Sequence, residues 1–176
     1  VAFDRAAPTF RKKLYKEYQA TRPKMDEDLV GQIEKVHELV AAFGIPIYEM
    51  DGFEADDIIG TITKQCRMLN PVAGRAGAES QVIIVTGDRD ILQLVVDETV
   101  FVYMPTKGLS EAKLYGEKEV VERMGVAPKL IADLKALMGD SSDNYPGVSG
   151  IGPKTAVNLI SEFGSVEAVY KAIGKK

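Results

Sequence analysis

Apolar residues recur every three or four positions between residues 26 and 44, which predicts an amphipathic helix. Asp26 is suited to cap its start, and Gly44 is suited to end it. Its apolar stripe consists of Leu29, Ile33, Val36, Val40 and Phe43. We expect Phe43 to lie in the protein core. A second helix is predicted over residues 54–69, followed by a loop over residues 70–80, which are rich in glycine, alanine and proline.

Four short apolar runs predict strands that alternate with the helices. They are residues 1–3, 45–50, 81–86 and 99–104. Residues 82–85 are all apolar, which is typical of a strand buried on both faces of a parallel sheet. Further helices are predicted over residues 91–95, 117–124, 128–138, 154–163 and 166–173. Gly164 is suited to end the helix before it, and Ser165 to cap the last one.

This alternation predicts an α/β fold with a mainly parallel central sheet flanked by helices. The C-terminal part of the chain, in contrast, carries only helical patterns. We therefore predict two domains. Residues 1–138 would form an α/β core that includes a basic arm at about residues 5–25, and residues 139–176 would form a small helical subdomain.

Composition excludes whole classes of protein. The 176 residues are 45% hydrophobic with a formal net charge of −4, and no apolar run approaches the roughly 18 residues that a membrane span needs. Cys66 is the single cysteine and cannot form an internal disulfide, so we expect the protein to reside in a reducing, cytoplasmic compartment. A single histidine argues against histidine-based zinc chemistry. Because the chain starts at Val1, within an apolar run and without methionine, we expect a piece of a longer protein.

Acidic residues follow three of the predicted strands and occupy one later polar loop. The eight acids are Asp4, Glu54, Asp56, Asp57, Asp88, Asp90, Asp140 and Asp143. In a parallel sheet, the loops that follow the strands converge beyond one edge, where ligands bind. We therefore expect three of these four acidic stretches to meet there. Carboxylates held within a few ångströms repel one another strongly at an interior-like dielectric, so their meeting would require bound cations.

Hard divalent ions fit this set of ligands. Mg²⁺ takes oxygen ligands and keeps waters or phosphate oxygens, and pairs of such ions about 3.5–4 Å apart serve phosphoryl transfer. Without the eight acids, the 22 basic residues outnumber the acidic ones that remain, so the rest of the protein can hold a polyanion. The pattern thus predicts a site for hard divalent ions of the kind used in phosphoryl transfer, on a protein that can hold a polyanion.

Each acidic stretch also has an ordinary structural interpretation. Glu54, Asp56 and Asp57 could serve only as acids at the positive end of a helix. Asp88 and Asp90 could belong to a simple turn and helix cap, and the polar loop to an Asx-turn. We favour the metal site because independent capping would not direct three acidic stretches to one edge of the sheet.

Glycines punctuate the start of the helix predicted over residues 154–163. They let the backbone approach a ligand closely, and the free N–H groups of a helix N-terminus attract phosphate. The candidate contacts are Gly147, Gly150, Gly152, Lys154 and Thr155. This is the helix–hairpin–helix pattern, which holds the DNA backbone without reading its sequence. The alternative is a tight turn between two helices, with Pro153 at the first helical position.

Seven basic residues lie between residues 5 and 24, interleaved with aromatic side chains. Such a segment suits the clamping or threading of a single strand. Its candidate contacts are Arg11, Lys16, Tyr18 and Arg22. A solvated charged surface is the alternative, and we favour binding because the segment lies beside the predicted acidic site.

These motifs occur together and in the same order in one known family. Along its whole length, the chain resembles the 5′-nuclease domain of bacterial DNA polymerase I, within the flap-endonuclease-like superfamily. The motifs that carry the resemblance are residues 1–4 with 10–11, 18–23, 54–57, 86–90, 137–144 with 146–148, and 150–156. The resemblance implies a PIN-like or Rossmann-like α/β core followed by a helix–hairpin–helix subdomain.

The resemblance also implies roles for individual residues, cofactors and partners. The first metal site is matched by Asp4, Glu54 and Asp56, the second by Asp88, Asp90, Asp140 and Asp143, with Asp57 close to both. The implied ions are two Mg²⁺, with Mn²⁺ as a substitute, and K⁺ at the hairpin. The implied partners are DNA with 5′ flaps, nicks or branched junctions, RNA primers in RNA–DNA duplexes, and a polymerase domain in the parent chain. The basic arm matches part of an arch that passes the 5′ strand, no membrane is involved, and the implied location is the bacterial cytoplasm, near the nucleoid.

The chain departs from the family pattern in two respects. The family's sheet begins with a strand that carries another metal-binding aspartate, and this strand would precede Val1. Gln19 stands where the family usually has a lysine that steers the scissile phosphate, so we expect slower cleavage unless Lys16 or Arg22 substitutes for it. The leading hypothesis is a two-metal 5′→3′ exonuclease and flap endonuclease. The alternatives are a catalytically impaired module that binds flaps or junctions, and an RNA-cutting nuclease, which the hairpin disfavours.

Overall fold

The structure is a computed structural model that describes residues 1–69, 81–107 and 111–174. The chain divides into two compact units, which are described separately. Unit 1 contains Val1–Thr61 and Ser141–Tyr145, and unit 2 contains Ile62–Asp140 and Pro146–Lys176. The loop predicted over residues 70–80 lies outside the described residues. Within the described ranges, no helix combines the length and apolar character that crossing a membrane requires.

Unit 1 is mainly helical, with one short pairing of extended chain. α1 spans Phe10–Leu14, α2 spans Glu27–Ala42, and α3, which spans Ala55–Leu69, starts in this unit. Ala2 forms a parallel bridge with Tyr48. The strands predicted around these two residues are therefore reduced to one bridge, and the sequence pattern does not predict α1.

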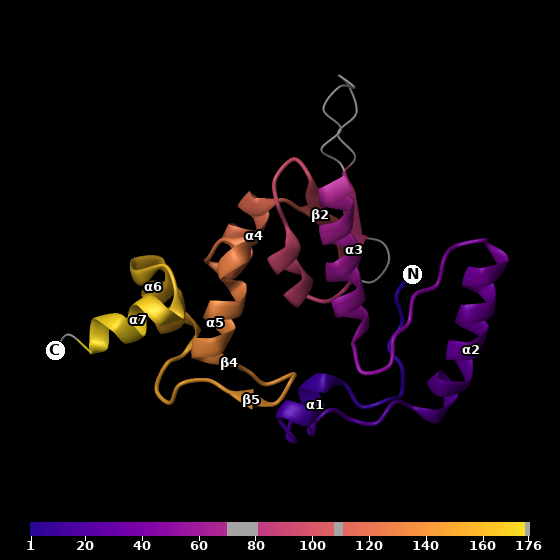
Figure 1. Ribbon diagram of the computed structural model, residues 1–176, viewed down its shortest axis with the longest axis horizontal. Coiled ribbons are helices and arrows are strands. Elements are labelled where there is room, and N and C mark those ends of the chain that lie inside the picture. Colours follow the sequence, from indigo (N-terminus) through magenta and orange to yellow (C-terminus); the bar gives the residue numbers. More distant parts are fainter. Residues whose placement is uncertain (70–80, 108–110, 175–176) are drawn as a thin grey trace. The chain divides into compact units, whose positions relative to one another are not determined.

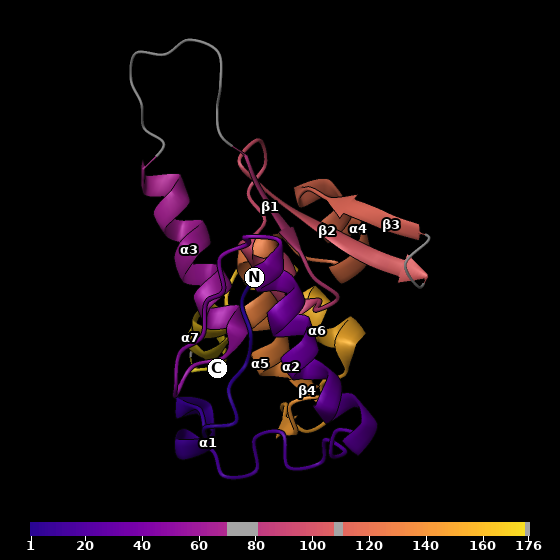
Figure 2. The same ribbon diagram turned by 90° about the vertical axis from the view of Figure 1, so that its right-hand side faces the viewer.

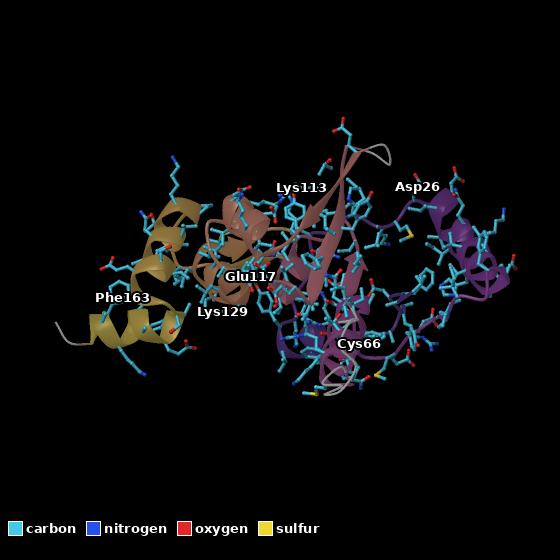
Figure 3. All side chains as sticks on the ribbon, turned by 90° about the horizontal axis from the view of Figure 1, so that it is seen from above. Asp26, Cys66, Lys113, Glu117, Lys129 and Phe163 are labelled. Atoms are coloured by element: carbon cyan, nitrogen blue, oxygen red, sulfur yellow. The ribbon has the colours of Figure 1, made fainter. Side chains whose placement is uncertain are left out.

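Helix α2 has the predicted bounds but not the predicted burial. Asp26 caps its start, where the side chain accepts a hydrogen bond from Asp28 N at 3.0 Å (Figure 3). Four of the five stripe residues are exposed, with 46% of Leu29 and 73% of Phe43 accessible to solvent, and Val40 is half-buried. The expectation that Phe43 belongs to the core is wrong, because local spacing fixes the helix but not what packs against it.

Unit 2 contains a three-stranded sheet in the order β1, β2, β3 (Figure 2). β1 spans Val82–Val85, β2 spans Val100–Lys107 and β3 spans Glu111–Tyr115. β1 and β2 pair in parallel, with Val82 opposite Val100, whereas β2 and β3 are antiparallel. The sequence pattern does not predict β3, because the residues of this strand are mostly polar or small and all but its last are exposed.

Strand β1 is buried on one face only. Ile84 is buried, whereas Ile83 and Val85 are 55% and 69% exposed. The prediction of a strand buried on both faces is therefore wrong for the described residues. A continuous apolar run shows that a strand can be covered on both sides, but it does not specify the covering element.

The helices of unit 2 follow the predicted pattern closely. They are the 3₁₀ helix η1 (Asp90–Leu94), α4 (Glu117–Met124), the 3₁₀ helix η2 (Pro128–Leu130), α5 (Ile131–Met138), α6 (Pro153–Phe163) and α7 (Val166–Ile173). α6 and α7 pack against each other and against α5 (Figure 1). Ser165 caps α7 by accepting a hydrogen bond from Ala168 N at 3.2 Å, as its position after Gly164 predicts.

The core of unit 2 supports the acidic residues at its surface. Its fully buried side chains include Leu92, Val95, Val100, Val102, Val120, Ile131 and Ile160. Leu92 lies in η1 and Ile131 in α5, and these two elements are in contact. After α5 the chain forms β4 (Gly139–Asp140), which pairs with β5 (Tyr145–Pro146).

Candidate metal centre

In unit 1, acids gather at the start of α3. Asp4 Oδ1 accepts a hydrogen bond from Ala55 N at 2.7 Å, and Asp57 Oδ2 accepts one from Glu54 N at 2.9 Å. These contacts satisfy N–H groups that have no partner within the helix, and the positive end of the helix favours the negative charges. Asp56 lies in the same first turn and is half-buried. Helix capping therefore accounts for part of this acidic stretch, as the ordinary interpretation expects.

Arg11 neutralises the next pair of acids. Its guanidinium donates two hydrogen bonds to the carboxylate of Asp57, at 2.7 and 2.8 Å, and lies 3.4 Å from Glu54 Oε2. The bidentate contact from Arg11 lowers the pKa of Asp57, and the same contact raises the pKa of Arg11. Arg11 was proposed as a DNA contact, and in this structure its charge is directed to the acids.

Tyr18 is a buried partner of Glu54. This residue is only 8% exposed, and its hydroxyl donates a hydrogen bond to Glu54 Oε2 at 3.1 Å. Burial raises the pKa of Glu54, which the charge of Arg11 only partly opposes. Burial, followed by the charge of Glu54, raises the pKa of Tyr18 as well, so its hydroxyl keeps its proton at neutral pH and remains a donor.

Asp143 lies in the part of the loop that belongs to unit 1. Its Oδ1 accepts hydrogen bonds from Arg22 Nη2 at 2.8 Å and from Gln19 Nε2 at 3.2 Å. The structure thus connects four of the eight predicted acids within unit 1. Three of them, Asp4, Glu54 and Asp57, meet at the start of α3, and Asp143 is joined to them through residues 18 and 19.

Three further acids lie in unit 2. Asp88 Oδ1 accepts a hydrogen bond from Asp90 N at 2.8 Å, and Asp88 N donates to Thr86 Oγ1 at 3.1 Å. This local turn follows β1, as predicted. A carboxylate oxygen of Asp90 lies within 4.8 Å of one from Asp140, the last residue of β4.

Lys135 joins the acids of unit 2. Its Nζ donates hydrogen bonds to Asp90 Oδ1 and to Asp140 Oδ2, and its side chain is only 14% exposed. Burial raises the pKa of Asp90. Burial opposes the charge of Lys135 too, but the hydrogen bonds to Asp140 and Asp90 outweigh it and raise the lysine pKa, so the ammonium stays charged.

Sequence reasoning did not identify Lys135. It is the only basic residue of α5, whose sequence is IADLKALM. Within a mostly apolar helix, a single lysine five residues before Asp140 was a usable signal, since a buried lysine requires an acidic partner.

The acids of unit 2 are suited to hold a divalent ion. Asp90 and Asp140 both direct carboxylate oxygens at one cationic group, the Lys135 ammonium, so this position already stabilises positive charge. All these ligands are hard oxygen donors, and the single histidine of the chain, His37, contacts Glu49 rather than any of these acids. This set of donors fits Mg²⁺ or Mn²⁺ and does not fit a cysteine- or histidine-bound metal.

The predicted hairpin stands before α6. Gly152 is the N-cap of α6, Pro153 takes its first position, and Lys154 and Thr155 are exposed in the first turn. Gly150 has φ +82°, a left-handed conformation that favours glycine. The exposed first turn leaves backbone N–H groups and one positive charge available at the surface of unit 2.

Gly147 approaches its own chain rather than open space. A Cβ at this position would lie 2.3 Å from the backbone carbon of Met138 and 2.4 Å from Gly139 N. Val148 N donates to Leu137 O at 2.7 Å, which fixes the same contact. The glycine is therefore required by the packing of residues 147–148 on the end of α5.

Comparisons with known proteins assign both parts of the chain to one type of family. Residues 1–125 match the model described as "5'-3' exonuclease, N-terminal resolvase-like domain", and residues 126–176 match "5'-3' exonuclease, C-terminal SAM fold". The DNA polymerase I of Bacillus subtilis (strain 168) is 42% identical over 180 residues, which cover 100% of this chain and 19% of that protein. The DNA polymerase I of Bacillus caldotenax is 43% identical over 174 residues, covering 98% and 19%.

Solved structures show a similar fold. A bacteriophage T5 flap endonuclease in complex with DNA and metal ions has a TM-score of 0.75 and 26% identity, covering 96% of this chain and 61% of that one. A T5 5′-exonuclease with bound zinc ions has a TM-score of 0.74 and 25% identity, covering 97% and 61%. The chain thus spans about a fifth of the length of its curated relatives and about three fifths of these structural neighbours.

Proposed function

Because the chain belongs to the 5′-3′ exonuclease family, we propose that it is the nuclease portion of a bacterial DNA polymerase I and hydrolyses phosphodiesters from 5′ ends and at 5′ flaps. The resemblance identified from the sequence is confirmed by both family models. The observation that carries the proposal is the juxtaposition of Asp90 and Asp140 around one cationic position, on a fold shared with a flap endonuclease that binds DNA and metal ions.

We further propose that the eight acids bind two divalent ions, with Mg²⁺ as the usual ion and Mn²⁺ as a substitute. Asp90, Asp140 and Asp88 would serve from unit 2, and the remaining five acids from unit 1. When bound, such ions supply an activated water and stabilise the leaving oxygen of the phosphodiester. The residues of this chain hold the ions, orient the carboxylates and keep their negative charges balanced.

The proposed substrates are DNA with 5′ flaps, nicks or branched junctions, and RNA primers in RNA–DNA duplexes. Lys16 of the basic arm is exposed and available to a phosphate. Gly150 and the first turn of α6, with Lys154 and Thr155 exposed, would hold the backbone of a duplex, with K⁺ as a bridging ion. We place this activity in the bacterial cytoplasm, in a parent chain that also carries a polymerase domain.

The test removes the acids one at a time. Asp140→Ala and Asp88→Ala should abolish cleavage of a labelled 5′-flap DNA in Mg²⁺, because the substituted residues no longer hold the ions. Binding of the same DNA, measured in Ca²⁺, should be retained. Glu122→Ala is the matched control, since Glu122 is an exposed acid of α4 outside the acidic groups. Full cleavage by Asp140→Ala would contradict the proposed mechanism.

A second candidate function, binding without cleavage, is favoured by Gln19. The family resemblance implies a lysine at this position that steers the scissile phosphate. Glutamine is uncharged and would hold a phosphate less strongly, and the Gln19 amide is already bonded to Asp143. Forming the complex with flap DNA in Ca²⁺ and then adding excess Mg²⁺ separates the two functions. A nuclease releases a product at this step, whereas a binding module leaves the DNA intact.

A further inference from the structure

Residues 17–22, here called the bridging segment, and the loop that carries Asp143 are joined by hydrogen bonds to backbone carbonyls. Gln19 N donates to Asp143 O at 2.9 Å, and Arg22 Nε donates to Ser142 O at 3.2 Å. In the reverse direction, Asn144 Nδ2 donates to Glu17 O at 2.7 Å. Three hydrogen bonds between positions about 120 residues apart in the chain therefore hold the loop to this segment.

The bridging segment also holds two predicted metal ligands by their side chains. Tyr18 donates to Glu54 Oε2 at 3.1 Å, and the next residue, Gln19, donates to Asp143 Oδ1 at 3.2 Å. Adjacent residues of one segment thus connect Glu54 to Asp143. Arg22 adds a charged hydrogen bond to the same oxygen of Asp143 at 2.8 Å.

The backbone of Gln19 is shaped for this contact. Its φ of +55° lies in the left-handed region, which residues other than glycine and asparagine seldom adopt. In this conformation both its backbone N–H and its side-chain amide donate to the same residue, Asp143. Such conformations persist only where surrounding contacts over-determine them. Here both donors of Gln19 are bonded to Asp143, and its carbonyl accepts a hydrogen bond from Arg22 N at 3.1 Å.

We propose that Tyr18, Gln19 and Arg22 are positioning residues that hold the carboxylates of Glu54 and Asp143 in place for ion binding. The proposal rests on the proposed metal-dependent function. The three residues act through the carboxylates: Tyr18 restrains Glu54, and Gln19 and Arg22 fix the orientation of Asp143 by bonding one of its two oxygens. Ligands that are already ordered lose less freedom when an ion binds, so partners of this kind strengthen metal affinity.

The experiment measures Mn²⁺ binding to the DNA-free protein by isothermal titration calorimetry. The variants are Tyr18→Phe, which removes only a hydroxyl, Gln19→Gly, which keeps the backbone donor and tolerates the left-handed conformation, and Arg22→Met. Each should weaken Mn²⁺ binding by about tenfold or more, the typical effect of removing a partner behind a metal ligand. Arg22→Lys keeps the charge but lacks the second donor to Ser142, and should restore only part of the affinity.

Lys35→Met is the matched control, since it removes an exposed positive charge from α2 of the same unit. It should leave Mn²⁺ affinity unchanged. Unchanged or tighter binding in Arg22→Met would overturn the inference, because tighter binding would mean that Arg22 competes with the ion. Thermal unfolding in EDTA identifies any variant that has lost its fold.

A cleavage assay adds a readout that general damage would not move. The variants should need about tenfold more Mg²⁺ for half-maximal flap cleavage, and excess Mg²⁺ should restore the rate. Loss of rate that excess Mg²⁺ fails to restore would also count against the inference. Asp143→Ala tests the proposed function separately: if it binds Mn²⁺ as tightly as the unmodified chain, the metal assignment itself is wrong.

Discussion

The acids of the two units are held in different ways. In unit 1, Glu54, Asp57 and Asp143 depend on side chains of the first 22 residues, namely Arg11, Tyr18, Gln19 and Arg22. In unit 2, Asp90 is the first residue of η1 and Asp140 lies in β4, directly after α5. Leu92 of η1 and Ile131 of α5 are buried, and the two acids share one lysine.

The two units reduce the repulsion between neighbouring carboxylates in different ways. Like charges at close range must be balanced by positive groups or held apart. In unit 1, several donors on a polar segment stabilise the carboxylates, so each donor contributes a modest part of the stabilisation. In unit 2, a rigid backbone and a single ammonium do so, and each of them therefore contributes a larger part. We therefore expect single substitutions to be more damaging in unit 2 than in unit 1.

Gly147→Ala should have the largest effect, because it breaks the rigid support of unit 2. The added Cβ would overlap the backbone at Met138 and Gly139, which lead directly to Asp140. We expect a loss of about 4 kcal/mol or more in the free energy of unfolding, as for other severe overlaps with backbone. Urea unfolding followed by circular dichroism measures it. Gly152→Ala is the control, since a Cβ there meets no atom within 4 Å.

Lys135→Met should have the next largest effect. It leaves Asp90 and Asp140 facing each other without their shared cation, at a cost of about 3 kcal/mol. Mg²⁺ should recover much of this loss, since the two carboxylates then gain another cation. Thermal unfolding with EDTA and with Mg²⁺ gives both values. If EDTA leaves the midpoint of this variant equal to that of the unmodified chain, Lys135 is not the balancing charge.

Arg11→Met should cost less, about 2 kcal/mol, the scale of hydrogen bonds to a charged group. Asp57 loses two hydrogen bonds but keeps the N–H of Glu54, and Glu54 keeps Tyr18. The same unfolding measurement checks the value. A loss larger than that of Lys135→Met would reverse the contrast drawn between the units.

The pH dependence should show the smallest effect and gives opposite signs for two neighbours in unit 1. The pKa of Asp57 is lowered in the folded protein, so its stabilising contribution is present above about pH 4 and is lost as the pH falls through the lowered pKa. The pKa of Glu54 is raised, so protonation from neutral pH toward its ordinary pKa of 4.5 adds stability. Urea unfolding between pH 2.5 and 7 should show a shallower acid loss in Asp57→Asn and a smaller gain below neutrality in Glu54→Gln. Unchanged profiles would contradict these assignments.

The sequence predicted those features that depend on neighbouring residues. Asp26 and Ser165 identify the starts of α2 and α7, and the apolar spacing gives most of the helices, because caps and periodicity act within a few positions. The turn at Asp88 that follows β1 was found for the same reason. The metal-binding roles of the eight acids stay predictions.

The sequence did not predict features that depend on distant partners. Phe43 was expected in the core and is exposed, and Ile83 and Val85 were expected under a covering layer and are exposed. Burial is set by what packs on a surface, which periodicity does not specify. The partners of Asp143 and of Asp140 were also missed. Gln19 lies 124 residues before Asp143, and Lys135 is a lone lysine in a predicted helix, to which the pattern of acids assigned no role.

The shared lysine of unit 2 has a consequence for the order of events. One ammonium faces two carboxylates, so this locus keeps a surplus of negative charge. A phosphate group approaching it would be repelled, while a small doubly charged cation would be attracted. The ions should therefore bind before the DNA. The nucleic acid should then meet a site whose local charge the ions have already changed from negative to positive.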